Sequence, residues 1–217
     1  MKNTSKIEVV IFDMDGVLIE AKDWHYESLN KALKLFGFNI SRHEHLTSYD
    51  GLPTRKKLEL LSLESDLPKE LHSFINEMKQ AYTMDMLHTL CHPRFVHEYA
   101  LSQLKSAGYK IAVASNSIRA TIDVMMDKAR LTPYLDIIFS ADDVEIGKPD
   151  PEIYTKTIAY FGVRPEQCLI VEDNENGIKA ARASGAHVLE VREVIDTNLD
   201  NIMARINQIN TSVKEVA

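Results

Sequence analysis

The sequence has few of the features that mark a secreted, membrane-bound or nucleic-acid-binding protein. Its 217 residues include only two cysteines, Cys91 and Cys168, which cannot form a disulfide framework and fit a reducing compartment. No apolar run approaches the length of a membrane span, and the first residues lack the apolar stretch of a signal peptide. The net charge of −7 argues against the basic surface that sequence-blind nucleic-acid binding needs. We therefore expect a cytoplasmic protein, a monomer or small homo-oligomer, with no nucleic-acid or membrane partner.

What the sequence does contain is a regular alternation of short apolar runs and helical patterns. Apolar runs that do not alternate with polar residues indicate strands covered on both faces, hence a parallel sheet flanked by helices. The runs are Ile7–Phe12, Lys110–Ala114, Ile137–Phe139, Cys168–Val171 and His187–Val191. Helical spacing predicts helices over Phe95–Ser106, Ile118–Ala129, Glu152–Phe161 and Asn176–Ser184, and a last amphipathic helix containing Leu199, Ile202, Ile206 and Ile209. This alternation predicts a doubly wound, Rossmann-like α/β fold.

One long interval interrupts the alternation. Residues 19–90 contain no convincing strand but several helical stretches, among them Tyr26–Phe36, Arg55–Leu63 and Glu70–Tyr82. The interval is too long for a simple crossover between two strands. We therefore predict an all-helical cap domain over residues 19–90, inserted into an α/β core formed by residues 1–18 and 91–217.

Acidic residues follow the first and the fourth apolar runs. Asp13 and Asp15 directly follow the first run and precede Gly16. In an open α/β sheet ligands bind beyond the carboxyl ends of the strands, although an Asp-x-Asp-Gly segment could also be a cap or a turn. Glu172 and Asp173 follow the fourth run. Adjacent carboxylates repel each other, but they are suitable oxygen ligands for a divalent cation.

Two further segments carry groups suited to an anion. Ser115 and Asn116 end the second run, where hydroxyl and backbone N–H groups could bind phosphate. Ser115 or Ser117 could instead only cap the helix that follows. Lys148 lies between Gly147 and Pro149, in a loop that would present a positive charge, and a solvated lysine in a turn is the alternative. The four segments together favour a site for a phosphate and a cation.

These four segments, in this order at the ends of apolar runs, resemble the motifs of the haloacid dehalogenase-like superfamily. The match is closest to the branch with a helical cap after the first motif. The resemblance implies a Mg²⁺-dependent enzyme acting on a small phosphorylated metabolite, with Asp13 as nucleophile and Asp15 as general acid and base. The dehalogenating branch lacks the second aspartate, so Asp15 favours cleavage of a C–O–P ester.

The resemblance also assigns the remaining core motifs. It implies that Ser115 and Asn116 hold the transferring phosphate and that Lys148 neutralises it. The Mg²⁺ ligands it implies are the side chains of Asp13, Glu172 and Asp173 and the backbone carbonyl of Asp15.

Within the cap, the resemblance indicates residues that contact the substrate. Thr54 and Arg55 end a segment that resembles the substrate-specificity loop of the cap, and Lys79 lies where capped relatives place a basic contact. Arg55 could instead be a surface arginine, and Lys79 a solvated lysine on a helix. His25 has the spacing of the cap-hinge histidine of the family's β-phosphoglucomutase.

Three functions remain open from the sequence. We favour a phosphatase, in which water attacks an aspartyl-phosphate. A β-phosphoglucomutase-like phosphomutase, in which a sugar hydroxyl replaces water, is supported by His25 and the Asp-Gly-Val form of the first motif. A signalling module phosphorylated on aspartate is the third, but such modules are shorter and lack a helical cap. Two departures from the family pattern, Glu20 for Asp and Arg94 for Gly, have no explanation in the sequence.

Overall fold

The computed structural model describes residues 6–49 and 51–215. The described residues up to Glu20, together with those from His92 onward, form one unit, and Ala21–Cys91 form a second. The sequence predicts domain limits after residues 18 and 90, and the two units divide after Glu20 and Cys91.

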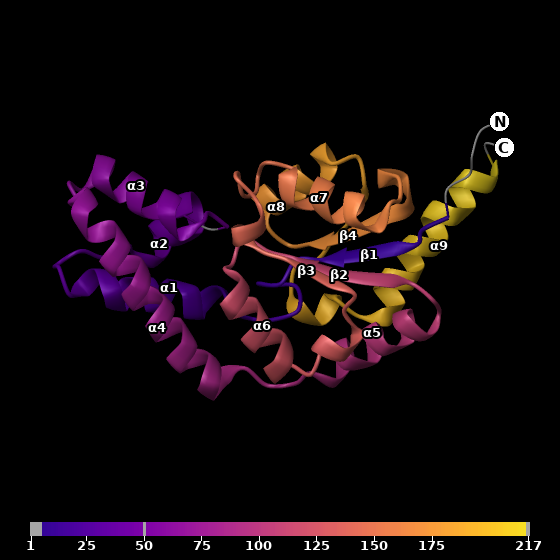
Figure 1. Ribbon diagram of the computed structural model, residues 1–217, viewed down its shortest axis with the longest axis horizontal. Coiled ribbons are helices and arrows are strands. Elements are labelled where there is room, and N and C mark those ends of the chain that lie inside the picture. The colour runs from indigo at the N-terminus through magenta and orange to yellow at the C-terminus, as the bar shows by residue number, and fades with distance from the viewer. Residues whose placement is uncertain (1–5, 50, 216–217) are drawn as a thin grey trace. The chain divides into compact units, whose positions relative to one another are not determined.

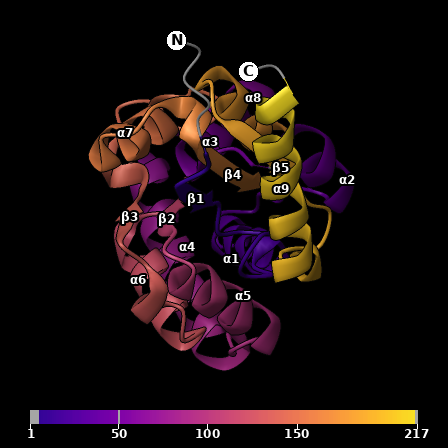
Figure 2. The same ribbon diagram turned by 90° about the vertical axis from the view of Figure 1, so that its right-hand side faces the viewer.

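The first unit is built on one sheet of five parallel strands in the order β3-β2-β1-β4-β5 (Figures 1 and 2). The strands are β1 (Val9–Phe12), β2 (Lys110–Ala114), β3 (Ile137–Phe139), β4 (Cys168–Glu172) and β5 (His187–Glu190). The first strand of the chain therefore lies at the centre of the sheet. This arrangement confirms the predicted doubly wound α/β fold, with strand limits that differ from the prediction by at most two residues.

Helices cover both faces of this sheet (Figures 1 and 2). On one face, α7 (Glu152–Phe161) and α8 (Glu175–Ala183) pack on alternate strand residues such as Val9 and Ile11. On the other lie α5 (Phe95–Ser106), α6 (Arg119–Lys128) and α9 (Leu199–Glu215). Burial on both faces explains why the strands are continuously apolar in the sequence.

The second unit is helical wherever the structure describes regular elements in it, which confirms the inserted helical cap. Its helices are α1 (Lys22–Lys34), α2 (Arg42–Glu44), α3 (Thr54–Glu64) and α4 (His72–Leu90), with a π-helical turn at His45–Tyr49 and a 3₁₀ turn at Lys69–Leu71. Further 3₁₀ turns in the first unit are Thr132–Tyr134, Ala141–Asp143, Pro165–Gln167 and Val194–Asp196. Helices α1 and α4 pack side by side around an apolar centre that includes Leu29, Leu33 and Ile75. No helix among the described residues is long and apolar enough to cross a membrane.

The two departures from the family pattern pair with each other. Glu20 is the last residue before the helical insertion, and Arg94 follows soon after the chain returns to the α/β unit at His92. The Arg94 Nη2 atom lies 2.5 Å from Glu20 Oε2, and the two side chains are 44% and 69% exposed. An ion pair this exposed contributes about 0–1 kcal/mol. The two departures thus form one exposed ion pair.

Candidate active site

The register of the sheet brings acidic residues of the first and last motifs together. Phe12 pairs with the residues that precede Ala114 in β2 and Glu172 in β4, so Asp13 lies level with both. Asp173 adds a third carboxylate. Ligand oxygens of Asp13, Glu172 and Asp173 all lie within 4.8 Å of one another. Three side chains that the sequence predicts as cation ligands therefore form one cluster at the carboxyl end of the sheet.

The ammonium of Lys148 lies against this cluster. Lys148 Nζ donates to Asp13 Oδ1 at 2.6 Å, to Glu172 Oε1 at 2.7 Å and to the carbonyl oxygen of Ala114 at 2.9 Å. These three bonds use all the donors of an ammonium group. Burial lowers the pKa of Lys148, but the charges of Asp13 and Glu172 raise it by more, so the pKa lies above its ordinary value. Lys148 is therefore a protonated cation inside the site.

The charge of the cluster is not balanced by Lys148 alone. Burial raises the pKa of Asp13, the charge of Lys148 lowers it, and the charges of Glu172, Asp173 and Asp15 raise it again, leaving it well above its ordinary value. Several carboxylates that share one ammonium retain an excess of negative charge. Closely spaced carboxylate oxygens are the donors that Mg²⁺ prefers, and a divalent cation supplies the missing positive charge. The side chains present therefore fit a Mg²⁺ site.

The predicted phosphate-binding segment follows β2 and is tied to the lysine loop. Ser115 is buried, and its Oγ accepts a hydrogen bond from the backbone N–H of Ser117 at 3.1 Å. Asn116 Oδ1 accepts from the backbone N–H of Lys148 at 3.0 Å, and its Nδ2 donates to the carbonyl oxygen of Lys148 at 3.4 Å. Asn116 thus holds the backbone of Lys148. The sequence does not predict this contact.

Asp15 lies in a turn that only a following glycine allows. Gly16 has a φ of +88°, a conformation that is unfavourable for other residues, and its N–H donates to Ile19 O at 2.7 Å. Asp15 Oδ2 accepts a hydrogen bond from the hydroxyl of Ser117 at 3.0 Å. Ser117, which the sequence indicates only as a helix cap, is therefore a direct neighbour of the proposed acid and base.

Two more residues that contact Glu172 are not indicated by the sequence. The hydroxyl of Tyr154 donates to Glu172 Oε1 at 2.6 Å. A Cβ atom added at Gly177 would lie 1.8 Å from the same oxygen, so only glycine lets the first turn of α8 approach this closely. Tyr154 has the helical spacing of an ordinary core residue, beside Ile153 and before Ile158, and this pattern hides its polar contact.

In the helical unit the structure brings two of the predicted residues together. Lys79 Nζ on α4 lies 3.2 Å from His25 Nδ1 on α1. Thr54 is the first residue of α3. The Arg55 side chain is 87% exposed, and its Nε lies 3.1 Å from Glu59 Oε1 on the same helix. In the structure Arg55 therefore contacts a residue of its own helix.

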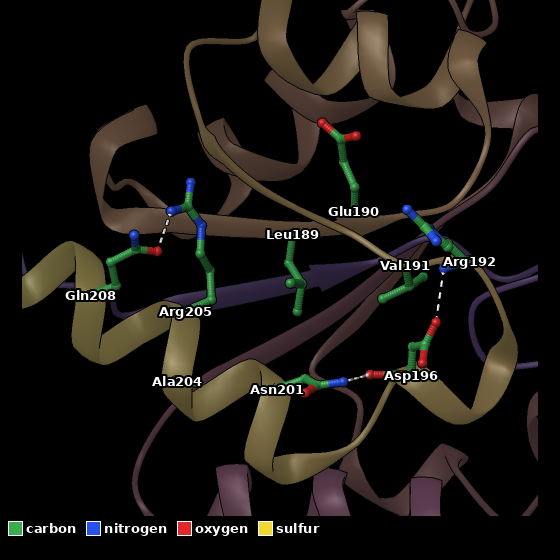
Figure 3. A pocket seen from close by; sticks show the side chains of 9 residues that line it. All are labelled: Leu189, Glu190, Val191, Arg192, Asp196, Asn201, Ala204, Arg205 and Gln208. Atoms are coloured by element: carbon green, nitrogen blue, oxygen red, sulfur yellow. Dashed lines mark hydrogen bonds between the residues drawn. The ribbon is translucent and has the colours of Figure 1, made fainter.

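A separate hollow of about 550 Å³ lies between β5 and α9 (Figure 3). Polar groups that line it bond to one another: Arg205 Nη1 donates to Gln208 Oε1 at 2.7 Å, and Asn201 Nδ2 donates to the carbonyl oxygen of Asp196 at 2.9 Å. None of the predicted site residues lines this hollow, so it is not part of the candidate active site.

One known protein family matches most of this chain. The model of the haloacid dehalogenase-like hydrolase family matches residues 10–191, which is most of the chain. The chain belongs to this family. The match spans all four motifs of the site and confirms the resemblance inferred from the sequence.

Individual relatives of this haloacid dehalogenase-like hydrolase include two phosphatases, and a solved phosphomutase shares its fold. The phosphorylated carbohydrates phosphatase of Thermotoga maritima is 29% identical over 179 residues, 82% of each chain. The phosphoglycolate phosphatase of Aquifex aeolicus is 30% identical over 180 residues, again 82% of each chain. The solved β-phosphoglucomutase (pgmB) of Clostridium difficile shares the fold, with a TM-score of 0.79, 23% identity, and coverage of 93% of this chain and 98% of that chain. The chain is thus an enzyme of a hydrolase family, and both of these sequence relatives are phosphatases.

Proposed function

We propose that this hydrolase-family member is a Mg²⁺-dependent phosphatase that cleaves a small organic phosphate monoester through an aspartyl-phosphate on Asp13. One observation carries the proposal. Asp13 follows the central strand, 2.6 Å from the ammonium of Lys148 and within 4.8 Å of two further acidic side chains. The relatives from Thermotoga maritima and Aquifex aeolicus, both named as phosphatases, support it.

Electrostatics explain why these residue types are needed. A carboxylate and a phosphate oxygen about 4 Å apart repel by about 4 kcal/mol per pair of unit charges at an effective dielectric constant near 20. Lys148 offsets part of this repulsion. The side chains of Asp13, Glu172 and Asp173, with the backbone carbonyl of Asp15, would hold Mg²⁺. When bound, Mg²⁺ supplies positive charge that stabilises the transferring phosphoryl group.

The chain's own residues account for two chemical steps. Asp13 forms a bond to phosphorus as the ester P–O bond breaks, and protonated Asp15 gives its proton to the leaving oxygen. Water then attacks the phosphorus of the aspartyl-phosphate and gives a proton to Asp15. The bond between Asp13 and phosphorus breaks, so inorganic phosphate is released and the Asp13 carboxylate is restored. The Ser117 hydroxyl holds Asp15 for both transfers. Ser115 and Asn116 hold the transferring phosphate, and the Asn116 side chain also holds the Lys148 loop.

A phosphomutase is the second candidate, because a sugar hydroxyl can replace water in the second step. The spacing of His25, which is that of the cap-hinge histidine of β-phosphoglucomutase, favours it, and His25 Nδ1 lies 3.2 Å from Lys79 Nζ. The fold shared with β-phosphoglucomutase is consistent with it. Thr54 and Arg55 on α3 are proposed substrate contacts in either case. The inserted helical unit and Asp15 argue against a signalling module, which needs neither a cap nor an acid and base.

A panel of phosphate esters tests the proposed function. With Mg²⁺ the purified protein should release inorganic phosphate catalytically from several small esters, and excess EDTA should abolish release until Mg²⁺ is restored. Phosphate release and sugar isomers are measured together, with glucose 1-phosphate included. Conversion of glucose 1-phosphate to glucose 6-phosphate without release of phosphate would establish the mutase instead.

The same panel tests the role of Asp15 as acid. Asp15→Asn should slow alkyl phosphates by about 10²–10⁴-fold, because their leaving oxygen needs a proton. It should slow p-nitrophenyl phosphate much less in the first step, since p-nitrophenolate leaves unprotonated. Equal losses for both ester types in single-turnover measurements would remove Asp15 from this role.

A further inference from the structure

A tyrosine of the core contacts both charged groups beside Asp13. Tyr154 is fully buried on α7, and its hydroxyl donates to Glu172 Oε1 at 2.6 Å. The ammonium of Lys148 lies 4.7 Å from the centre of the Tyr154 ring. The Tyr154 ring thus lies beside Lys148, while its hydroxyl acts as a donor to Glu172.

Donors surround the carboxylate of Glu172. Oε1 accepts from Tyr154 and Lys148, and Oε2 accepts from the backbone N–H groups of Asp173 at 3.0 Å and Asn174 at 3.3 Å. Gly177 of α8 lies close against the same side chain. The orientation of Glu172 is thus determined by α7, the lysine loop and the start of α8. Among these donors, only the hydroxyl of Tyr154 is a neutral side-chain group.

Packing alone does not require that hydroxyl. The Tyr154 ring lies in the apolar layer with Ile153 and Ile158, and a phenylalanine ring fills nearly the same volume. A buried hydroxyl instead needs a hydrogen-bond partner, and this one has a carboxylate of the cation cluster. Partners that orient metal-ligating carboxylates influence metal affinity by about 10–100-fold.

We propose that Tyr154 is a positioning residue of the cation site, whose hydroxyl orients Glu172 toward the shared cation. The inference rests on the proposed function, because it takes Glu172 as one of the Mg²⁺ ligands. The hydroxyl of Tyr154 donates its hydrogen bond to Glu172. It acts through Glu172, and through the ion pair of Glu172 with Lys148.

The test is Tyr154→Phe, with Tyr160→Phe as the matched control. Tyr160 lies on the same helix, but its side chain is 57% exposed. Isothermal titration of the substrate-free protein with Mg²⁺ should show binding about 10-fold weaker for Tyr154→Phe and unchanged for Tyr160→Phe. At limiting Mg²⁺ the kcat of Tyr154→Phe should fall, and saturating Mg²⁺ should restore most of it, with the KM for the ester unchanged.

A double-mutant cycle with Glu172→Gln separates positioning from a general structural effect. If Tyr154 acts through Glu172, Tyr154→Phe should weaken Mg²⁺ binding no further in the Glu172→Gln background. Additive losses, or an unchanged Mg²⁺ affinity of Tyr154→Phe in the otherwise native protein, would overturn the proposal while leaving the phosphatase intact. A native protein that neither binds Mg²⁺ nor cleaves any ester would overturn both proposals.

Discussion

Asp13→Asn should lower kcat/KM by about 10⁴-fold or more, because asparagine cannot form the aspartyl-phosphate; losses of this size follow removal of a catalytic nucleophile. The fold should persist. Asparagine has nearly the same shape, and its amide oxygen can still accept the hydrogen bond from Lys148. Steady-state kinetics and circular dichroism measure the two effects.

The matched control for this variant is Asp123→Asn. Asp123 lies on α6, where its carboxylate pairs with Arg119 and is about half exposed. This control should keep the activity of the native protein. Retention of more than a few per cent of that activity by Asp13→Asn would remove Asp13 as the nucleophile.

Lys148→Met should lower both activity and stability. The Lys148 side chain is only 5% exposed, and its loss leaves Asp13 and Glu172 without their buried counter-charge. Breaking a buried ion pair by removing one partner costs about 3–5 kcal/mol. For a protein of this size that corresponds to a melting temperature roughly 10 °C lower. Activity should fall by about 10²–10³-fold, since a charge that stabilises the transition state is lost.

The effect of Mg²⁺ on the melting temperature is a second test of the role of Lys148. Without Lys148 the acidic cluster depends more on a bound cation, so Mg²⁺ should raise the melting temperature of Lys148→Met by more than that of the native protein. The control is Lys156→Met on α7, where the lysine is half exposed and pairs with Glu152. A Lys148→Met protein as stable as the native one in EDTA, or one that gains no more from Mg²⁺, would contradict the assigned charge balance.

The strands and the order of the motifs could be predicted because they depend on local rules. Strands buried on both faces are continuously apolar, and parallel strands place their carboxyl ends on one edge of the sheet. The sequence could therefore predict Asp13 and Glu172 near each other, although they are far apart in the chain, and the resemblance added Lys148. The register of β1 with β4 places Asp13 level with Glu172.

Contacts between side chains of different elements could not be predicted in this way. Nothing in the periodicity around Tyr154 distinguishes a hydroxyl bonded to Glu172 from an ordinary core tyrosine. The pairing of Asn116 with the backbone of Lys148 joins loops 32 residues apart. The ion pair joins Glu20 and Arg94, which are 74 residues apart in the sequence. The sequence shows that both residues depart from the family pattern, but it does not show that they pair.

The limits of a helix in the cap differ from the prediction for a second reason. The sequence predicts a helix over Glu70–Tyr82, whereas α4 runs from His72 to Leu90. The buried face of α4 is formed by Ile75, Lys79, Thr83 and Leu87, and two of these residues are polar. Amphipathic spacing predicts a helix clearly only where the buried face is apolar.

The most direct test is to trap the phosphorylated enzyme. The protein is mixed with a good ester and Mg²⁺, quenched in acid during turnover, and digested for mass spectrometry. One phosphoryl group should lie on the peptide that contains Asp13, should be released by hydroxylamine as an acyl phosphate is, and should be absent from Asp13→Asn. An unmodified Asp13 peptide during rapid ester cleavage, or a phosphoryl group on another residue such as Ser115, would contradict the account.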